Sequence, residues 1–530
     1  MNVTPRASAL ILVILAFAAV PSAQTQSAAS LVVDTTMGQL KGIARPGGGA
    51  EFLGIPYAQP PVGDLRWHEP LPTKPWSGVR EAASFGAPCS QPDLGDWNRH
   101  DAETGKEDCL FLNVIAPEWP VIKPLPVMFW IHGGANEGGT ASSALYKDGT
   151  LVKHRVILVT VNYRLGIFGF LAHPELTAES AHHGSGNYGL MDQVLALRWV
   201  RDNITRFGGD VNNITVFGQS AGSMDTSMLM TSPLAKDLFQ KAIGESGAAF
   251  TAPLLPLPSA EQVGASLAQQ LGAPAGSEQI KFLRTLSASD LLTTLAKLPS
   301  HLRVGPDIDG WVLPELPASV FALGREAHIP LLYGTTTREF GSNQSVAQLR
   351  GAITLSAGKF VSKTLAAYGL ADGAQGTNDP KYGAAADQWF ADIVFRCPAT
   401  TQGAWHAAAH NATYEYEFNR AIPGQDNSVH SADLPYVFGY FPKWGNISGK
   451  FGDVDITLAD LMETYWTNFA KTGNPNGTGL PKWPQQDDNG TYIQFQQDGS
   501  VQTAAGLRAA QCSIYREWLT ARIVNNETAH

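Results

Sequence analysis

A serine in the first half of the chain stands in a setting that suits nucleophilic chemistry. Ser220 lies in Gly218-Gln219-Ser220-Ala221-Gly222, which has the pattern G-x-S-x-G. An apolar run, 214–217, precedes it, and a segment of helical composition, 221–230, follows it. A sharp strand-to-helix turn of this kind lifts the serine hydroxyl off the strand and onto the positive end of the helix. Because glycine is a tenth of the chain, an ordinary glycine-rich turn is the alternative interpretation.

A serine hydroxyl is a poor nucleophile near neutral pH, so it needs a base and hydrogen-bond donors for the oxyanion. His132-Gly133-Gly134-Ala135 follows an apolar run, 127–131, and its small residues allow backbone N–H groups to approach a carbonyl carbon closely. The sequence therefore predicts an oxyanion hole made by the N–H groups of Gly134, Ala135 and Ala221. A tight turn also uses glycines, so this motif is weak by itself.

The elements around these motifs indicate an α/β fold. The continuous apolar runs 127–131 and 156–161 are typical of central strands, and 214–217 is a third. Apolar residues at spacings of three and four predict a helix over 190–204, and a second clear helix is predicted over 458–469. The pattern favours a mostly parallel central sheet with helices on both faces, followed after residue 245 by long helical and loop insertions.

Bulk composition limits the classes of partner. The chain has 530 residues, is 44% hydrophobic and 16% charged, and carries a formal charge of −10 without a basic run, which argues against a nucleic-acid partner. Residues 1–23 have the pattern of a signal peptide: Arg6, an apolar stretch over 7–20, then small residues. That stretch is too short to span a bilayer comfortably, so no membrane insertion is expected, a short anchor being the alternative. We expect residues 24–530 to form a single domain of a secreted or periplasmic protein.

Four cysteines fit an exported chain, in which a small even number usually pairs. Three pairings are possible, of which Cys89 with Cys109 and Cys397 with Cys512 is the simplest, and buried free thiols are the alternative. Asn-x-Ser/Thr sequons are scattered along the chain, for instance at Asn203, Asn213, Asn343, Asn411, Asn446, Asn476 and Asn489.

Taken together, these motifs resemble the type B carboxylesterases, the cholinesterase-like branch of the α/β-hydrolases, over nearly the whole chain after residue 23. Further landmarks, in the family's order, are Phe-Leu-Gly-Ile-Pro-Tyr-Ala-Gln-Pro-Pro at 52–61, Glu-Asp-Cys-Leu-Phe-Leu-Asn-Val at 107–114, Val-Asn-Tyr-Arg-Leu-Gly at 161–166 and Asn-Tyr-Gly-Leu-Met-Asp-Gln at 187–193. The resemblance implies an α/β-hydrolase fold and a serine carboxylesterase that acts on small-molecule esters, with no metal and no organic cofactor.

The resemblance also implies the partners of Ser220. The family's acid ends a Gly-x-x-x-x-Glu segment, which Gly334-Thr-Thr-Thr-Arg-Glu339 matches, and its base begins a segment that His430-Ser-Ala-Asp-Leu-Pro-Tyr-Val-Phe-Gly439 matches. The order Ser, Glu, His is that of the fold. The resemblance further implies that Ser246 supports the acid. It also implies two disulfides, Cys89–Cys109 and Cys397–Cys512, and two structural ion pairs, Arg66–Glu107 and Arg164–Asp192.

Several positions depart from the family's commonest pattern. Ala135 and Asn136 replace a third glycine and an aromatic residue, so we expect a methyl group that crowds bulky alcohols and a more polar wall. Gln219 stands where cholinesterases have a carboxylate, and Trp97 matches their cation-binding aromatic only approximately, which disfavours choline esters. The loop 90–108 is strongly charged and makes a poor interfacial lid, which favours soluble esters over emulsified fat.

Two other functions compete with ester hydrolysis. Some cholinesterase-like domains are non-catalytic adhesion proteins, but those usually lack the serine that this chain retains. The same fold also hydrolyses amides, and no residue pattern here distinguishes the two bonds.

Overall fold

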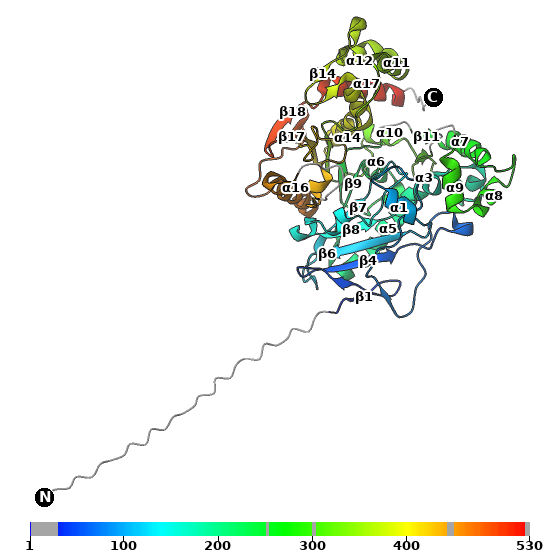
Figure 1. Ribbon diagram of the computed structural model, residues 1–530, viewed down its shortest axis with the longest axis vertical. Helices are drawn as coiled ribbons and strands as arrows, with labels where there is room; N and C mark the ends of the chain where they lie inside the picture. The colour runs from blue at the N-terminus through cyan, green and yellow to red at the C-terminus, as the bar shows by residue number, and fades with distance from the viewer. Residues whose placement is uncertain (2–29, 251–253, 299–303, 442–449, 525–530) are drawn as a thin grey trace. The chain divides into compact units, whose positions relative to one another are not determined.

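A computed structural model describes residue 1 and residues 30–250, 254–298, 304–441 and 450–524. The predicted signal peptide therefore lies outside the described residues. From Leu31 onward the chain forms one compact unit, and many of its elements are labelled in Figure 1.

One large sheet organises this unit. Along the sheet its strands are β18 Val501–Ala505, β17 Thr491–Phe495, β16 Thr413–Phe418, β13 Leu331–Thr336, β10 Lys241–Glu245, β9 Gly209–Gln219, β7 Leu125–Ile131, β8 Ile157–Val161, β6 Phe111–Ala116, β4 Ala50–Pro56 and β3 Ile43–Ala44. The strands from β17 to β8 pair in parallel, which confirms the mostly parallel centre. Both ends of the sheet pair antiparallel, which the apolar runs did not indicate.

The remaining strands form small sheets. They are β1 Val32–Asp34, β2 Gln39–Lys41 and β5 Val79–Glu81 in one, β11 Leu255–Pro256 with β12 Asp307–Ile308, and β14 Asn378–Asp379 with β15 Gly383–Ala384. The α-helices are α1 Arg99–Thr104, α2 Ala144–Lys147, α3 Gly166–Phe170, α4 Pro174–Glu179, α5 Tyr188–Asn203, α6 Ala221–Leu229, α7 Leu257–Gln270, α8 Gln279–Thr285, α9 Ala288–Leu295, α10 Pro317–Ala322, α11 Val346–Ser356, α12 Val361–Ala367, α13 Ala385–Ala391, α14 Cys397–Ala408, α15 Leu434–Val437, α16 Asp453–Thr472 and α17 Ala509–Val524.

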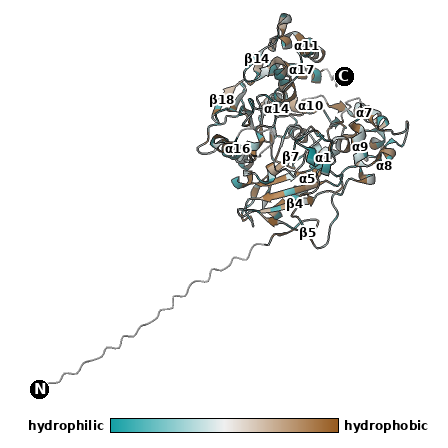
Figure 2. Cartoon of the chain, in the orientation of Figure 1, coloured by the Kyte–Doolittle hydropathy of each residue, from teal (hydrophilic) through white to brown (hydrophobic). Residues whose placement is uncertain are grey.

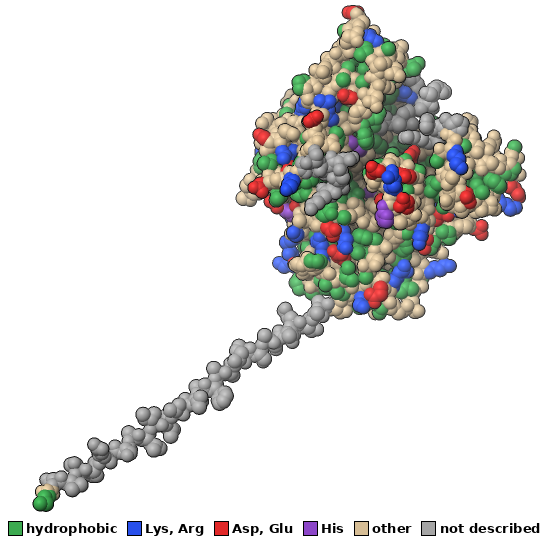
Figure 3. Space-filling model, viewed as in Figure 1, with side chains coloured by type: hydrophobic (Ala, Val, Ile, Leu, Met, Phe, Trp, Pro, Cys, Tyr) green, Lys and Arg blue, Asp and Glu red, His purple; other side chains and the backbone are tan. Residues whose placement is uncertain are grey.

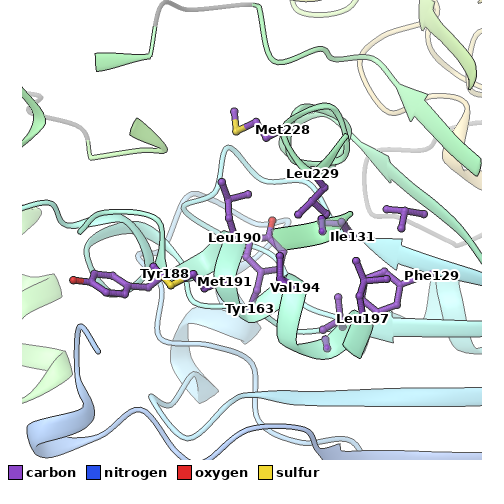
Figure 4. Close-up of a cluster of buried hydrophobic side chains, with 14 of the residues drawn as sticks. Phe129, Ile131, Tyr163, Tyr188, Leu190, Met191, Val194, Leu197, Met228 and Leu229 are labelled. Carbon is purple, nitrogen blue, oxygen red and sulfur yellow. The ribbon is translucent and has the colours of Figure 1, made fainter. Parts of the chain in front are cut away.

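Both faces of the large sheet are covered, because alternate residues of a strand point to opposite sides. In β7, Phe129 and Ile131 belong to a core shared with α5 and α6, whereas Met128 and Trp130 belong to a second core with α16. Figure 4 shows the first core, with the α5 side chains Leu190, Val194 and Leu197 beside Phe129 and Ile131. This double burial explains the unbroken apolar run of the strand, and the strands around β4 and β7 are mostly brown in Figure 2.

The predicted helices and strands are present, with shifted ends. Helix α5 begins two residues before the predicted 190–204 and ends one residue before its end. Helix α16 covers the predicted 458–469 and begins five residues earlier. Strand β9 begins at Gly209, before the predicted 214, since polar residues at its start still pair with the region of Leu125. The insertions after residue 245 include α7, α8 and α9, which lie together on one side, and α11, α12 and α17, which lie together at one end (Figure 1).

The predicted covalent and ionic links are confirmed. Cys89–Cys109 and Cys397–Cys512 are disulfides, with sequence separations of 20 and 115 residues. The Arg66 guanidinium donates to both Glu107 carboxylate oxygens at 2.6 Å. Arg164 donates to both oxygens of buried Asp192 at 2.8 Å. These links fix loops around the sheet.

Removing the long-range disulfide is expected to destabilise the protein more than removing the short one. A cross-link restricts the unfolded chain more when it closes a longer loop, so C397A/C512A should lower the free energy of unfolding by about 5 kcal/mol and C89A/C109A by about 3 kcal/mol. Denaturant unfolding of both double variants beside the wild type measures the difference. An equal or larger loss for C89A/C109A would contradict this expectation.

Candidate active site

Five neighbouring parallel strands place the predicted site residues at one edge of the sheet. In spatial order β7, β9, β10, β13 and β16 lie side by side, and their carboxyl ends face the same way. The segments that follow them carry, in the same order, the residues Gly134 and Ala135, Ser220, Ser246, Glu339 and His430. Ligand and catalytic sites of open α/β sheets occur at this edge.

Ser220 occupies a strained turn between β9 and α6. Its φ of 57° and ψ of −122° lie outside the regions that L residues favour. A Cβ on Gly218 would stand 2.5 Å from the backbone of Gly222, and one on Gly222 would stand 2.1 Å from the carbonyl oxygen of Ile131. Both glycines are therefore required by close backbone packing, and the turn has the geometry of a nucleophile elbow.

Glu339 and His430 meet directly. His430 Nδ1 lies 2.5 Å from Glu339 Oε2, and the backbone N–H of His430 donates to the Glu339 carbonyl at 2.9 Å. The other carboxylate oxygen, Oε1, accepts from Ser246 Oγ at 2.8 Å and from the Thr336 N–H at 2.9 Å. Every partner of the carboxylate is thus a donor, which orients it toward Nδ1. Ser246 stands where the family resemblance expects a serine that supports the acid.

The second imidazole nitrogen faces the serine turn. With the Nδ1 proton directed at Glu339, His430 Nε2 accepts from the Gln219 side-chain amide, whose nitrogen lies 3.0 Å away. Gln219 directly precedes Ser220. The imidazole therefore links the acid to the residue beside the serine, a contact of Gln219 that sequence reasoning missed.

The predicted oxyanion loop has three successive residues with positive φ. Gly134, Ala135 and Asn136 have φ values of 114°, 59° and 57°. A side chain at Gly134 is excluded, because its Cβ would stand 2.1 Å from the Gly138 carbonyl oxygen. Within the described part of the chain, the N–H groups of Gly134 and Ala135 donate to no backbone carbonyl. Ala135 is exposed.

The expectation that Asn136 makes the substrate wall polar is wrong. Its side chain is only 7% exposed. The amide nitrogen donates to Asp225 of α6 at 2.9 Å, and the amide oxygen accepts from the Tyr163 hydroxyl at 3.0 Å. The left-handed backbone turns this side chain into the protein interior, so it faces the helix that follows the serine.

Buried acids lie below the site. Glu245, at the end of β10, accepts the Ser220 N–H at its carbonyl and the Trp466 indole N–H at its carboxylate, both at 2.8 Å. Burial and the nearby Asp433 charge raise the pKa of Glu245 well above its usual range. Burial also raises the pKa of Asp433 to about 6, while the Tyr416 hydroxyl bonds to it at 2.8 Å. Burial and the nearby acid therefore both favour the neutral form of the Glu245 carboxyl.

Aromatic side chains flank the imidazole and the loop. The ring centroids of Phe340 and Phe395 lie 4.3 and 4.6 Å from that of His430. Phe340 is 48% exposed. On the other side, the ring of exposed Trp97 comes within 3.2 Å of the Cβ position of Gly134. Exposed apolar surface therefore lies beside the imidazole, on Phe340, and beside the oxyanion loop, on Trp97.

The first disulfide loop is polar, as predicted. Its helix α1 has the sequence Arg-His-Asp-Ala-Glu-Thr, has no buried residue and is teal in Figure 2. The loop is tied to the oxyanion segment, since the Gly139 N–H donates to Gln91 at 2.8 Å and Asn98 donates to the same oxygen at 3.0 Å. Nothing in this helix offers a broad apolar face to a lipid surface.

An arginine clamps the turn that carries the acid. The buried Arg396 guanidinium donates to the carbonyl oxygens of Thr336 and Thr337 at 3.1 and 2.8 Å. It also pairs with buried Asp392, which accepts from Arg508 at 2.7 Å. The sequence held one clue to this chain of contacts, because the predicted Cys397–Cys512 bond brings residues 396 and 508 near each other.

One group of metal-type ligands occurs among the described residues, at a different place. His154, Asp460 and Glu463 have donor atoms within 4.8 Å of one another. Thr150 Oγ1 donates to both oxygens of Glu463, at 2.8 and 2.9 Å, and the Asp460 side chain is 77% exposed. These residues belong to the 3₁₀ turn Leu151–His154 and to α16, whereas the predicted site residues follow the strand ends.

Comparison with known proteins agrees with this architecture. Residues 29–515 match the model of the carboxylesterase family. The chain is 33% identical to carboxylesterase 1E of Mus musculus, with 98% of this chain and 99% of that protein covered. It is 37% identical to para-nitrobenzyl esterase of Bacillus subtilis (strain 168), with 86% and 92% covered.

Among solved structures, a thermophilic PNB esterase superposes with a TM-score of 0.80 at 33% identity, covering 92% of this chain and all of that one. The sheet, the strand-to-helix turn and the helices on both faces define an α/β-hydrolase fold. The chain belongs to the carboxylesterase family and is a carboxylic ester hydrolase.

The described part of the chain contains no helix long and apolar enough to cross a membrane. On the face seen in Figure 3, Lys and Arg side chains are interspersed with Asp and Glu and do not gather into one patch. The family implies small-molecule esters as substrates.

Proposed function

We propose that this carboxylesterase works through a Ser220–His430–Glu339 triad and an acyl-enzyme. The Ser220 hydroxyl oxygen attacks the ester carbonyl carbon while His430 Nε2 takes its proton, and the N–H groups of Gly134, Ala135 and Ala221 hold the oxyanion. The tetrahedral adduct collapses, and the alcohol leaves with the proton from Nε2. Water then attacks the acyl-enzyme with the same base, which releases the acid and restores Ser220. No cofactor takes part.

The observation that carries this proposal is the orientation of His430. Its Nδ1 lies 2.5 Å from Glu339, so Nε2 is the basic nitrogen, and Nε2 is directed at Gln219, the residue beside Ser220. Catalysis then requires Nε2 to exchange the Gln219 amide for the Ser220 hydroxyl. Both partners belong to the same turn after β9.

The surroundings favour soluble esters with apolar groups. The exposed rings of Phe340 beside His430 and of Trp97 beside the oxyanion loop offer apolar contact area. The exposed Ala135 methyl group disfavours tertiary alcohols, and the polar helix α1 disfavours an oil interface. We therefore propose esters of primary alcohols or phenols, with no preference for long-chain triglycerides.

We also propose that the enzyme is exported, as a single catalytic domain after a cleaved signal peptide over 1–23. Two disulfides and the cation followed by an apolar stretch at the start of the sequence support this. If the host glycosylates, Asn343 and Asn489 are exposed acceptors among the described residues, whereas the Asn203 amide is buried and hydrogen-bonded to Trp199 and Thr36.

A panel of p-nitrophenyl esters from acetate upward, run with and without an organophosphate, tests the proposal. We expect turnover of the shorter esters that the trap abolishes in proportion to Ser220 labelled, read by mass spectrometry. A p-nitroanilide of the best acyl group separates ester from amide cleavage and should react far more slowly. Absence of turnover across the panel would favour the non-catalytic alternative, and label on another residue would overturn the assignment of Ser220.

A further inference from the structure

A buried polar bridge connects the oxyanion loop to the helix behind Ser220. Asn136 Nδ2 donates to Asp225 Oδ1 at 2.9 Å, and Gln193 Nε2 donates to Asp225 Oδ2 at 2.6 Å. The Tyr163 hydroxyl shares its one proton between the His132 carbonyl oxygen at 2.8 Å and Asn136 Oδ1 at 3.0 Å. All four side chains are buried. Tyr163 lies in the layer of α5 residues shown in Figure 4.

The bridge joins the two segments that supply the proposed oxyanion donors. Asn136 directly follows Ala135, and Asp225 lies on α6, the helix that begins with Ala221. Gln193 adds α5 to the same network. The separation of the Ala135 and Ala221 N–H groups therefore depends on the Asn136–Asp225 contact, and both groups must reach one oxygen at about 2.7–3.1 Å.

The carboxyl group in this bridge relies on amides for its stabilisation. Burial raises the pKa of Asp225 to about 7, partly offset by its bonds to Asn136 and Gln193. The titratable group that faces it is the Tyr163 phenol, whose ring stacks on His132 at 4.6 Å. Burial lowers the pKa of His132 to about 4, so that imidazole is neutral and supplies no positive charge. Burying the Asp225 carboxyl costs free energy, and the side chain lies between the two segments whose separation matters for the oxyanion donors.

We propose that Asn136 and Asp225 are positioning residues that set the geometry of the oxyanion hole by tying the loop after β7 to helix α6. The inference rests on the proposed function of Ser220 and of the oxyanion donors. It assigns a role to Asn136, which replaces the family's aromatic residue. The Asn136 side chain affects the stabilisation of the transition state through the position of the loop and does not contact substrate.

Variants that break the bridge and variants that rebuild it distinguish this role. N136A and D225A each remove one side of the contact. D225N preserves the contact with Asn136. Gln193 Oε1 has no hydrogen-bond partner among the described residues. When the Gln193 side-chain amide rotates, this oxygen accepts a hydrogen bond from the new side-chain NH₂ group at position 225. The exchange N136D/D225N also preserves each bond. The carboxylate then stands at position 136 and accepts from Tyr163 and from the amide at position 225, whose oxygen accepts from Gln193.

The chain offers a matched control in Asn187 and Asp307, a second buried Asn–Asp pair at the start of α5. Asn187 Nδ2 donates to Asp307 Oδ1 at 2.9 Å, and burial raises the pKa of Asp307 well above its usual range, as it does for Asp225. N187A removes a contact of the same chemistry outside the oxyanion loop. It should lower the thermal midpoint while turnover per active site stays at the wild-type value.

Active sites are counted with the organophosphate, so that kcat refers to folded, reactive Ser220. We expect N136A and D225A to lower kcat per site about 100-fold at unchanged KM, as loss of one oxyanion donor does. Affinity for a trifluoromethyl ketone, whose hemiketal oxygen occupies the oxyanion hole, should fall in parallel. D225N and N136D/D225N should keep kcat within about threefold of the wild type.

Wild-type kcat per site in both N136A and D225A would overturn the inference. So would a loss in either that leaves the ketone affinity unchanged, or an exchange variant that folds but stays as slow as N136A. If D225A fails to fold, N136A and the exchange variant decide. A wild-type enzyme without turnover, or with an unlabelled Ser220, would instead contradict the proposed function. Failure of the inference and failure of the proposed function therefore give different results.

Discussion

Replacing Ser220 by Ala is expected to lower kcat by about 10⁵- to 10⁶-fold while the protein stays folded. The substitution removes the atom that forms the acyl-enzyme, and the residual rate comes from substrate binding and the oxyanion donors. Initial rates with a p-nitrophenyl ester, together with circular dichroism and the thermal midpoint, measure both effects.

A buried serine outside the site provides the control. The Ser232 hydroxyl donates to the Val312 carbonyl at 2.6 Å, away from the strand edge that carries the site. S232A should lose stability and keep its turnover. Near-normal hydrolysis by S220A that the organophosphate still blocks would refute the assignment of Ser220.

Replacing Glu339 by Gln is expected to lower kcat by about 10⁴-fold without removing a side chain from the site. Oε1 has two donors as partners, Ser246 Oγ and the Thr336 N–H, so the oxygen of the new amide must stay there. Its NH₂ group then faces His430 Nδ1 and forces the proton onto Nε2. An imidazole in that tautomer cannot accept the Ser220 proton.

A graded series separates this tautomer effect from loose packing. S246A removes one donor to Oε1 but leaves the Thr336 N–H and the charge, so we expect a loss of about tenfold. E339A removes the carboxylate and leaves the imidazole free to take either tautomer, so it should be no slower than E339Q. If E339Q retained more than about a tenth of the wild-type turnover, Glu339 would not be the orienting acid.

Local sequence predicted the segments whose geometry depends on neighbours in the chain. The apolar run, the two glycines around Ser220 and the helix behind it all follow from backbone packing within one short stretch, and the structure has the strand, the turn and the helix there. The mostly parallel centre of the sheet followed from the unbroken apolar strands. Among the antiparallel strands at its ends, β3 and β18 are short or partly exposed. Strands β4 and β6 are buried, but an apolar strand does not reveal the direction in which it pairs.

The partners of Ser220 were not derivable in the same way. Glu339 and His430 lie 91 residues apart, and nothing near either of the two residues distinguishes them from other acids and from the 13 histidines. Only the family resemblance selected them. Asn136 was misread because its direction depends on a positive φ and on Asp225, 89 residues later.

The contacts of Arg396 with the turn before Glu339 depend on residues that are translated much later. Arg396 holds the carbonyl oxygens of Thr336 and Thr337, but its own partner Asp392 is completed only by Arg508. Cys397 likewise has to remain a free thiol until Cys512 emerges, 115 residues later. The segment that carries Ser220 is therefore translated early, whereas the contacts of Arg396 that hold the turn before Glu339 are complete only after Arg508 has been translated.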